Sequence, residues 1–200
     1  MAEIYASILS LRKQDVERKL KKVLKKIKGV HVDIMDGKFV PNTTLFNPAF
    51  VNSLQLPLFK DVHLMVKSPE KHIKYYIAAG ANTIDVHAES TRYILRIIKE
   101  IKGSNVKAAI VLNPETKIEK IKKYIPMVDE VLVMTVHPGF AGQKLITSVI
   151  PKIKKLKQIR EKEKLNFRIK VDGGIKSTHI KMLEKAGADI LVMGSALFGK

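Results

Sequence analysis

The chain contains no cysteine, and only six of its 37 basic residues are arginines. The lack of cysteine excludes disulfide bonds and thiolate chemistry. The absence of disulfide bonds is typical of cytoplasmic proteins. No apolar run approaches the roughly 20 residues that cross a bilayer, and none opens the chain as a signal peptide would. We therefore expect a cytoplasmic protein that has no membrane partner.

The scarcity of arginine also bears on the formal net charge of +18 at pH 7. Arginine makes better bidentate contacts to phosphates and bases than lysine does, and nucleic-acid-binding proteins usually cluster their basic residues on one face. The lysines here recur on the outer faces of helices expected at residues 14–28 and 147–162. Solvated helix surfaces, with a positive field that attracts an anionic substrate, explain this charge better than nucleic acid does. A nucleic-acid-binding barrel is kept as the alternative from a different class.

Strand and helix patterns alternate along the chain without a linker or a break in composition. One 3.6-residue apolar stripe, for example, contains Ile94, Ile97, Ile98 and Ile101. Helices are also expected at residues 14–28, 48–54, 117–124 (with Pro126 beyond its end), 147–162 and 177–186, and one helix is capped by Ser68, has Pro69 in its first turn and ends at Gly80. Strands are expected at residues 4–9, 29–35, 61–66, 83–87, 107–112, 130–136, 168–171 and 189–193.

Eight strands that alternate with helices predict a single (β/α)8 TIM barrel domain over residues 1–200, in the α/β class. Several strands are nearly continuous apolar runs, as buried parallel strands are. The runner-up, an open doubly wound sheet, seldom needs eight strands of such even spacing. Only residues 196–200 follow the last strand and its Gly-Ser end, so the eighth helix is expected to be truncated or absent. The seam between the first and last strands is then thinly covered or covered by a neighbouring subunit, and we expect a homo-oligomer.

Polar side chains gather at the carboxyl ends of these strands, where TIM barrels hold their active sites. His31 and Asp33 share one face of the strand at 29–35, while His63 and Asp172 end two other strands. Two imidazoles and two carboxylates suit a divalent ion such as zinc, ferrous iron, manganese or cobalt. Each residue also has a structural explanation when it is taken singly. His31 and Asp33 would be a hydrogen-bonded core pair, His63 a core histidine and Asp172 a turn-forming residue. Because all four are expected at one mouth of the barrel, a metal site is favoured.

Three consecutive strand ends on the other side of the mouth are rich in glycine. Glycine lets backbone N–H groups approach an anion closely, and barrels often hold phosphate in their last loops. These residues predict a phosphate site. They are Gly139, Phe140, Ala141 and Gly142, then Gly173 and Gly174, and finally Gly194 and Ser195.

Asp33 and Asp172 belong to the second and seventh strands, so they are expected to approach a substrate from opposite sides. Opposed carboxylates beside a metal suit reversible proton transfer at a carbon next to a carbonyl. Met35, Met65 and Met134 would line the cavity and exclude water, although core filling explains each of them equally well.

These residues lie in motifs that together resemble the ribulose-phosphate 3-epimerase family, over nearly the whole chain from Ser7 to Phe198. The motifs are HVDIMDGKFVPN at 31–42, DVHLM at 61–65, MTVHPGFAGQ at 134–143, VDGGI at 171–175 and GSALF at 194–198. The resemblance implies a metal-dependent isomerase of the pentose phosphate pathway that interconverts ribulose 5-phosphate and xylulose 5-phosphate.

The resemblance also implies roles for individual residues. Asp33 would accept the proton and Asp172 would donate it, and both would bind the metal together with His31 and His63. Ser7 and His63 would contact the substrate. The implied phosphate ligands are residues 139–142, Gly174, Gly194 and Ser195.

Some positions depart from the pentulose enzymes. Ala141 stands where those enzymes usually have glycine, and the segments 113–116 and 138–143 look more like the sister enzymes that act on allulose 6-phosphate. Gly173 and Gly174 lean back toward the pentulose enzymes. A sugar-phosphate decarboxylase is a further alternative, but its Asp-x-Lys-x-x-Asp arrangement is missing around Asp33.

Overall fold

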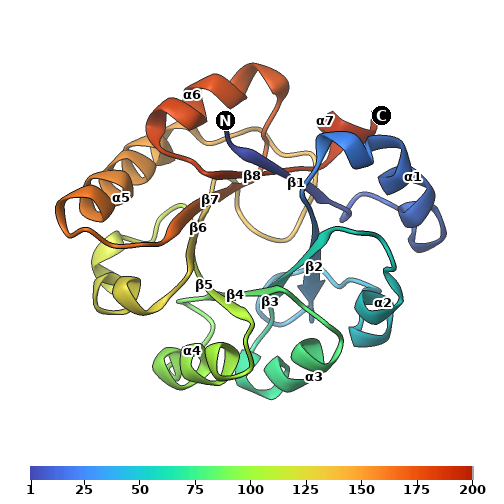
Figure 1. Cartoon of the computed structure of the whole chain (residues 1–200), viewed down its shortest axis with the longest axis horizontal. Helices are drawn as coiled ribbons and strands as arrows, with labels where there is room; N and C mark the ends of the chain where they lie inside the picture. The colour runs from blue at the N-terminus through green and yellow to red at the C-terminus, as the bar shows by residue number, and fades with distance from the viewer. Residues whose placement is uncertain (200) are drawn as a thin grey trace.

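The computed structural model describes residues 1–199 and shows a closed barrel of eight parallel strands, with each strand beside the next in chain order (Figure 1). Pairing of β1 with β8, Tyr5 opposite Val192, closes the ring. The prediction of a (β/α)8 barrel is confirmed, and the open sheet is wrong. The strands are β1 Glu3–Ser7, β2 Gly29–Met35, β3 Phe59–Met65, β4 Thr83–His87, β5 Lys107–Leu112, β6 Glu130–Met134, β7 Arg168–Asp172 and β8 Ile190–Met193.

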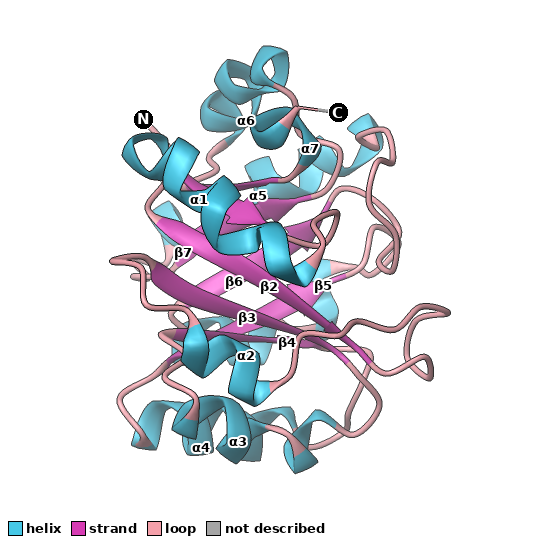
Figure 2. Cartoon of the chain, turned by 90° about the vertical axis from the view of Figure 1, so that its right-hand side faces the viewer, coloured by secondary structure: helices cyan, strands magenta, loops and turns pink. Residues whose placement is uncertain are grey.

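Helices cover the outside of the barrel, as the two perpendicular views show (Figures 1 and 2). Several of them begin or end in a 3₁₀ turn. The α-helices are α1 Val16–Val23, α2 Pro48–Ser53, α3 Ile73–Ala78, α4 Ile94–Gly103, α5 Ile150–Lys162, α6 Ile180–Ala186 and α7 Ser195–Phe198. The 3₁₀ helices are η1 Lys13–Asp15, η2 Leu24–Lys26, η3 Pro69–Lys71, η4 Ile118–Lys120, η5 Lys122–Met127, η6 Thr147–Val149 and η7 Ser177–His179.

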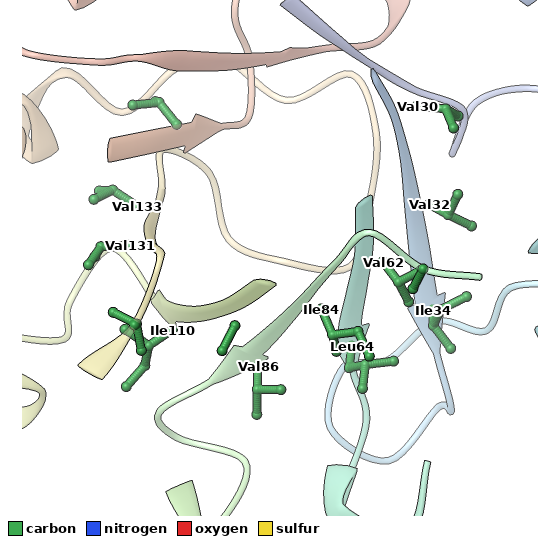
Figure 3. Packing of buried hydrophobic residues seen from close by; sticks show 14 of the residues in the cluster. Val30, Val32, Ile34, Val62, Leu64, Ile84, Val86, Ile110, Val131 and Val133 are labelled. Atoms are coloured by element: carbon green, nitrogen blue, oxygen red, sulfur yellow. The ribbon is translucent and has the colours of Figure 1, made fainter. Parts of the chain in front are cut away.

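The side chains of β2 alternate between two buried layers, which is why all seven of its residues are buried. Val30, Val32 and Ile34 lie on the outer side of the strand ring, in the layer that the helices cover (Figure 3). Because successive strand residues point to opposite faces, His31 and Asp33 point into the barrel. The aliphatic layer thus holds the strand while the interior face presents polar side chains.

Two local predictions are wrong. Ser68 makes no capping hydrogen bond to η3, because its backbone is left-handed at φ 58°, outside the extended conformation from which a serine caps a helix. The helix expected at 117–124 is instead two 3₁₀ helices, and Pro126 lies inside the second rather than beyond it. Proline lacks the N–H that a longer α-helix needs, so a short 3₁₀ turn suits this sequence better.

The truncated eighth helix is confirmed as the single turn α7, which contacts α1 beside the seam between β8 and β1 (Figure 1). Lys200, the last residue of the predicted domain, lies outside the described range. Within residues 1–199, every helix is too short or too polar to reach across a bilayer.

Candidate active site

Four side chains meet inside the barrel near the ends of β2, β3 and β7. His63 Nδ1 lies 3.1 Å from Asp33 Oδ1, because β2 and β3 pair with these two residues opposite each other. His31 Nε2 lies 3.4 Å from Asp33 Oδ1, 3.3 Å from His63 Nδ1 and 3.8 Å from Asp172 Oδ2. One ligand atom from each of the four lies within 4.8 Å of every other, so the structure brings together all four predicted metal-binding residues.

This donor set fits a divalent transition metal ion. Two imidazole nitrogens and two carboxylate oxygens are ligands that zinc, ferrous iron, manganese and cobalt accept in proteins. Burial lowers the pKa of His63 to about 3, so this imidazole is neutral at neutral pH, as a metal ligand must be. The two histidines are fully buried, which keeps competing water away from their ring nitrogens.

The two carboxylates differ in their protonation. Burial raises the pKa of Asp33, but the charge of His31 and the hydrogen bonds from His31 and His63 outweigh this effect and hold it well below its usual range. Burial and the nearby charge of Asp33 raise the pKa of Asp172 to about 7, although His31 opposes the shift. Near neutral pH, Asp33 is therefore ionised, while Asp172 holds a proton on a large fraction of molecules. Paired groups whose pKa values are driven apart are typical of an acid and a base.

A pocket opens above this cluster and is lined by every predicted site residue except the two buried histidines. Three methionines, Met35, Met65 and Met134, form part of its wall. The Ser7 hydroxyl lies in the same wall and donates a hydrogen bond of 3.0 Å to Asp33 Oδ2, which orients that carboxylate. The pocket has further lining residues that the sequence did not predict, all within three positions of predicted ones along the chain: Leu9, Ser10, Val136, Pro138, Gln143, Ile175, Lys176 and Val192.

The glycine-rich loops after β6 and β7 form the opposite wall. Gly139, Gly142, Gly173 and Gly174 all have positive φ angles between 65° and 124°. A backbone with positive φ is unfavourable for residues other than glycine. It directs successive N–H groups into a concave surface that suits anions. The loops after β6, β7 and β8 all line this one pocket. Their other lining residues that were predicted from the sequence are Phe140, Ala141, Gly194 and Ser195.

Gly174 provides a test of this wall. A Cβ atom at this position would lie 2.8 Å from the carbonyl carbon of Lys144, and φ is +65°. We expect Gly174→Ala to lower the free energy of unfolding by about 1–3 kcal/mol, because neighbouring backbone must shift, and to raise KM for a sugar phosphate. Gly103→Ala is the control, since nothing lies within 4 Å of a Cβ atom there. Equal KM values for Gly174→Ala and wild type would contradict a phosphate-binding role.

A buried charged cluster, which was not predicted from the sequence, lies inside the barrel beneath the site. The Lys170 ammonium group lies 2.6 Å from Asp61 Oδ1, 3.0 Å from Asp85 Oδ1 and 2.8 Å from Glu130 Oε2, and all four side chains are fully buried. Asp61 also lies 2.6 Å from His31 Nδ1, so the cluster directly supports a residue of the site.

This cluster had a signal in the sequence. Asp61, Asp85 and Lys170 each lie two positions before a polar strand-end residue, so they point into the barrel from the layer below. Burial lowers the pKa of Lys170, but the three carboxylates outweigh that effect and raise it well above its usual value. Burial raises the pKa of Asp85 well above its usual range, which relieves the excess negative charge around one ammonium group.

Comparisons with known proteins show which family this chain is similar to. The profile of the ribulose-phosphate 3 epimerase family matches residues 3–198. The ribulose-phosphate 3-epimerase of Bacillus subtilis is 45% identical over 176 residues, which cover 86% of this chain and 80% of the relative. The enzyme of the same name from Aquifex aeolicus is 40% identical over 173 residues, which cover 85% and 77% of the two chains.

Solved structures support the fold alone. A mutant tryptophan synthase alpha-subunit from Pyrococcus furiosus matches with a TM-score of 0.73 and 15% identity, over 98% of this chain and 87% of that one. Such low identity carries no statement about chemistry. The profile match and the relatives of 40% identity or more show that the chain belongs to the ribulose-phosphate 3-epimerase family.

Proposed function

We propose that this epimerase interconverts D-ribulose 5-phosphate and D-xylulose 5-phosphate by moving a proton at C3. The observation that carries the proposal is the pair Asp33 and Asp172, two carboxylates of different pKa on strands β2 and β7 that converge on one cluster. The curated relatives carry the name of this enzyme, which supports the pentulose as substrate. A glycine-lined wall beside the carboxylates provides the expected position for the phosphate group.

In the proposed reaction, ionised Asp33 takes the proton from C3 as the C3–H bond breaks. The electron pair of that bond moves toward the C2 carbonyl and gives an enediolate. Protonated Asp172 then delivers a proton to C3 from the opposite face, and the configuration of that carbon inverts. In the reverse direction the two residues exchange roles, which a pKa near 7 makes accessible to Asp172.

Other residues of the chain support this transfer. Ser7 holds Asp33 through its hydrogen bond and lies close enough to the pocket to contact the sugar. Met35, Met65 and Met134 present apolar sulfur to the pocket, which keeps water from protonating the enediolate. His31, Asp33, His63 and Asp172 would together hold one divalent metal ion. A bound cation would supply positive charge that stabilises the developing negative charge on the substrate oxygens.

Removal of the metal tests this proposal directly. We expect a strong chelator to abolish epimerisation, measured by a coupled assay that consumes xylulose 5-phosphate, and zinc, manganese, cobalt or ferrous iron to restore it. The physical reason is that one ligand atom from each of His31, Asp33, His63 and Asp172 lies within 4.8 Å of every other, which is a donor arrangement that a divalent cation stabilises. Full activity in thoroughly metal-depleted protein would contradict the metal-dependent mechanism.

The same assay distinguishes the pentulose from the alternative substrate, D-allulose 6-phosphate. One additional CHOH group changes binding by about 1–3 kcal/mol, so we expect kcat/KM to favour ribulose 5-phosphate by roughly 10–200-fold. A preference for the hexulose would instead assign the chain to that sister activity. The sugar phosphate is the proposed partner, while a cytoplasmic location, a homo-oligomer and the absence of nucleic-acid binding stay predictions from the sequence.

A further inference from the structure

Two polar side chains, the buried His87 and the half-buried Glu89, lead away from the site behind His63. His63 Nε2 lies 2.8 Å from His87 Nε2, and the two rings are stacked with centroids 5.0 Å apart. His87 Nδ1 lies 3.4 Å from Glu89 Oε2. The other oxygen of Glu89 accepts a hydrogen bond of 3.1 Å from the backbone N–H of Asn113, which holds the carboxylate in place. None of these contacts is used by the proton transfer proposed above.

The order of these atoms determines where the protons must lie when a metal is bound. His63 Nδ1 is the nitrogen that faces Asp33 and His31 Nε2, so it is the nitrogen that would bind the ion. A metal-binding nitrogen carries no proton, and the proton of neutral His63 must then lie on Nε2. His63 Nε2 can donate to His87 Nε2 only if that atom is unprotonated, which places the proton of His87 on Nδ1, toward Glu89.

Glu89 is suited to accept that proton. Burial raises its pKa, but the proximity of His87 and Thr116 and the hydrogen bond from the Asn113 N–H outweigh the effect and bring the pKa to about 2. An ionised carboxylate has only acceptor sites, so it repels the alternative arrangement in which the lone pair of His87 Nδ1 faces it. The reversed polarity, with a proton on His63 Nδ1, would direct an N–H group into the space that the metal requires.

The other histidine of the site is presented through its opposite nitrogen. His31 faces the cluster with Nε2, and its Nδ1 lies 2.6 Å from Asp61. Asp61 therefore contacts His31 directly, whereas the ring of His87 lies between Glu89 and His63. The two histidines face the cluster with opposite nitrogens, and each leads to a carboxylate outside it: the fully buried Asp61 for His31 and the half-buried Glu89 for His63.

We propose that Glu89, acting through His87, is a positioning residue that fixes the tautomer of His63 with Nδ1 free to bind a divalent metal ion. The inference rests on the metal site of the proposed function. It assigns Glu89 no contact with the substrate or the metal. Loss of such an outer partner typically lowers metal affinity by about 10–100-fold.

The test compares zinc affinity, measured by competition with a chromophoric chelator, in wild type, Glu89→Gln and Glu89→Asp. Glutamine can donate a hydrogen bond to His87 Nδ1 and so permits the reversed tautomer, whereas aspartate retains an acceptor. We expect Glu89→Gln to bind zinc about tenfold or more weakly and Glu89→Asp to recover part of the loss. Glu70→Gln is the matched control, because Glu70 accepts a hydrogen bond from Thr91 in the neighbouring loop and contacts no histidine of the site.

Nitrogen-15 NMR of the histidine rings provides a readout that does not depend on activity. We expect zinc-bound wild type to show a proton on Nε2 of His63 and on Nδ1 of His87, and Glu89→Gln to show a mixture of tautomers. Unchanged zinc affinity in folded Glu89→Gln, or a proton on Nε2 of His87 in wild type, would overturn the inference. If Glu89→Gln does not fold, the wild-type spectrum decides. If wild type binds no zinc, the metal site of the proposed function fails, while the His87 tautomer of the metal-free protein still decides this inference.

Discussion

Replacement of either Asp33 or Asp172 by asparagine should abolish epimerisation while the barrel stays folded. Asparagine is nearly isosteric with aspartate but can neither accept the C3 proton nor deliver one. Loss of a positioned acid or base typically costs about 10²–10⁴-fold in rate, and the loss of a metal ligand adds to it. We therefore expect kcat to fall by at least 10³-fold in each variant, measured with ribulose 5-phosphate in the coupled assay.

The control for this experiment is Asp15→Asn. Asp15 is bound by Arg12 and Arg18 on the surface and does not line the pocket, so its loss should leave kcat unchanged. Circular dichroism and thermal unfolding of each variant separate loss of chemistry from loss of fold. Near-full turnover by Asp33→Asn or by Asp172→Asn would refute the two-carboxylate mechanism, whatever the family of the chain.

Replacement of Lys170 by methionine should produce the largest loss of stability. Lys170 is the ammonium group on which the buried carboxylates of Asp61, Asp85 and Glu130 converge, and it also lies 5.7 Å from the ring of Tyr5. Removal of one partner from a buried ionic cluster leaves charge without compensation, which costs about 3–5 kcal/mol. In a domain of this size, that loss lowers Tm by roughly 6–20 °C. Chemical denaturation monitored by circular dichroism measures the change.

Two further variants make this prediction specific. Lys155→Met removes an exposed ion pair with Glu119 and should cost at most about 1 kcal/mol. Addition of Glu130→Gln to Lys170→Met removes one of the uncompensated carboxylates and should restore part of the lost stability. A loss below about 1 kcal/mol in Lys170→Met would show that the barrel interior tolerates these carboxylates without the ammonium group, through protonation or hydration.

Part of the fold and of the candidate site could be predicted from local sequence pattern. The alternation in β2 placed His31 and Asp33 on an inward face, because strand side chains alternate and aliphatic residues occupy the helix-covered side. Gly173 and Gly174 were predicted to let backbone N–H groups approach an anion, and both have the positive φ that glycine adopts readily. The errors were also local: the conformation of Ser68 and the 3₁₀ turn around Pro126 depend on how each loop meets the barrel, which no short window contains.

The sequence by itself determined the eight-stranded barrel, the family and the residues that end each strand, because these follow from periodicity and from distinctive motifs. Only the tertiary structure decided which of those residues share one cluster, since Asp172 approaches His31 solely because the ring closes. It also decided that Lys170 lies among three carboxylates, because Asp61, Asp85, Glu130 and Lys170 come from four different strands. The stacking of His63 on His87, which leads from the site to Glu89, likewise joins two strands. Side-chain chemistry is local, but the distances that make it a site come from the closure and register of the barrel.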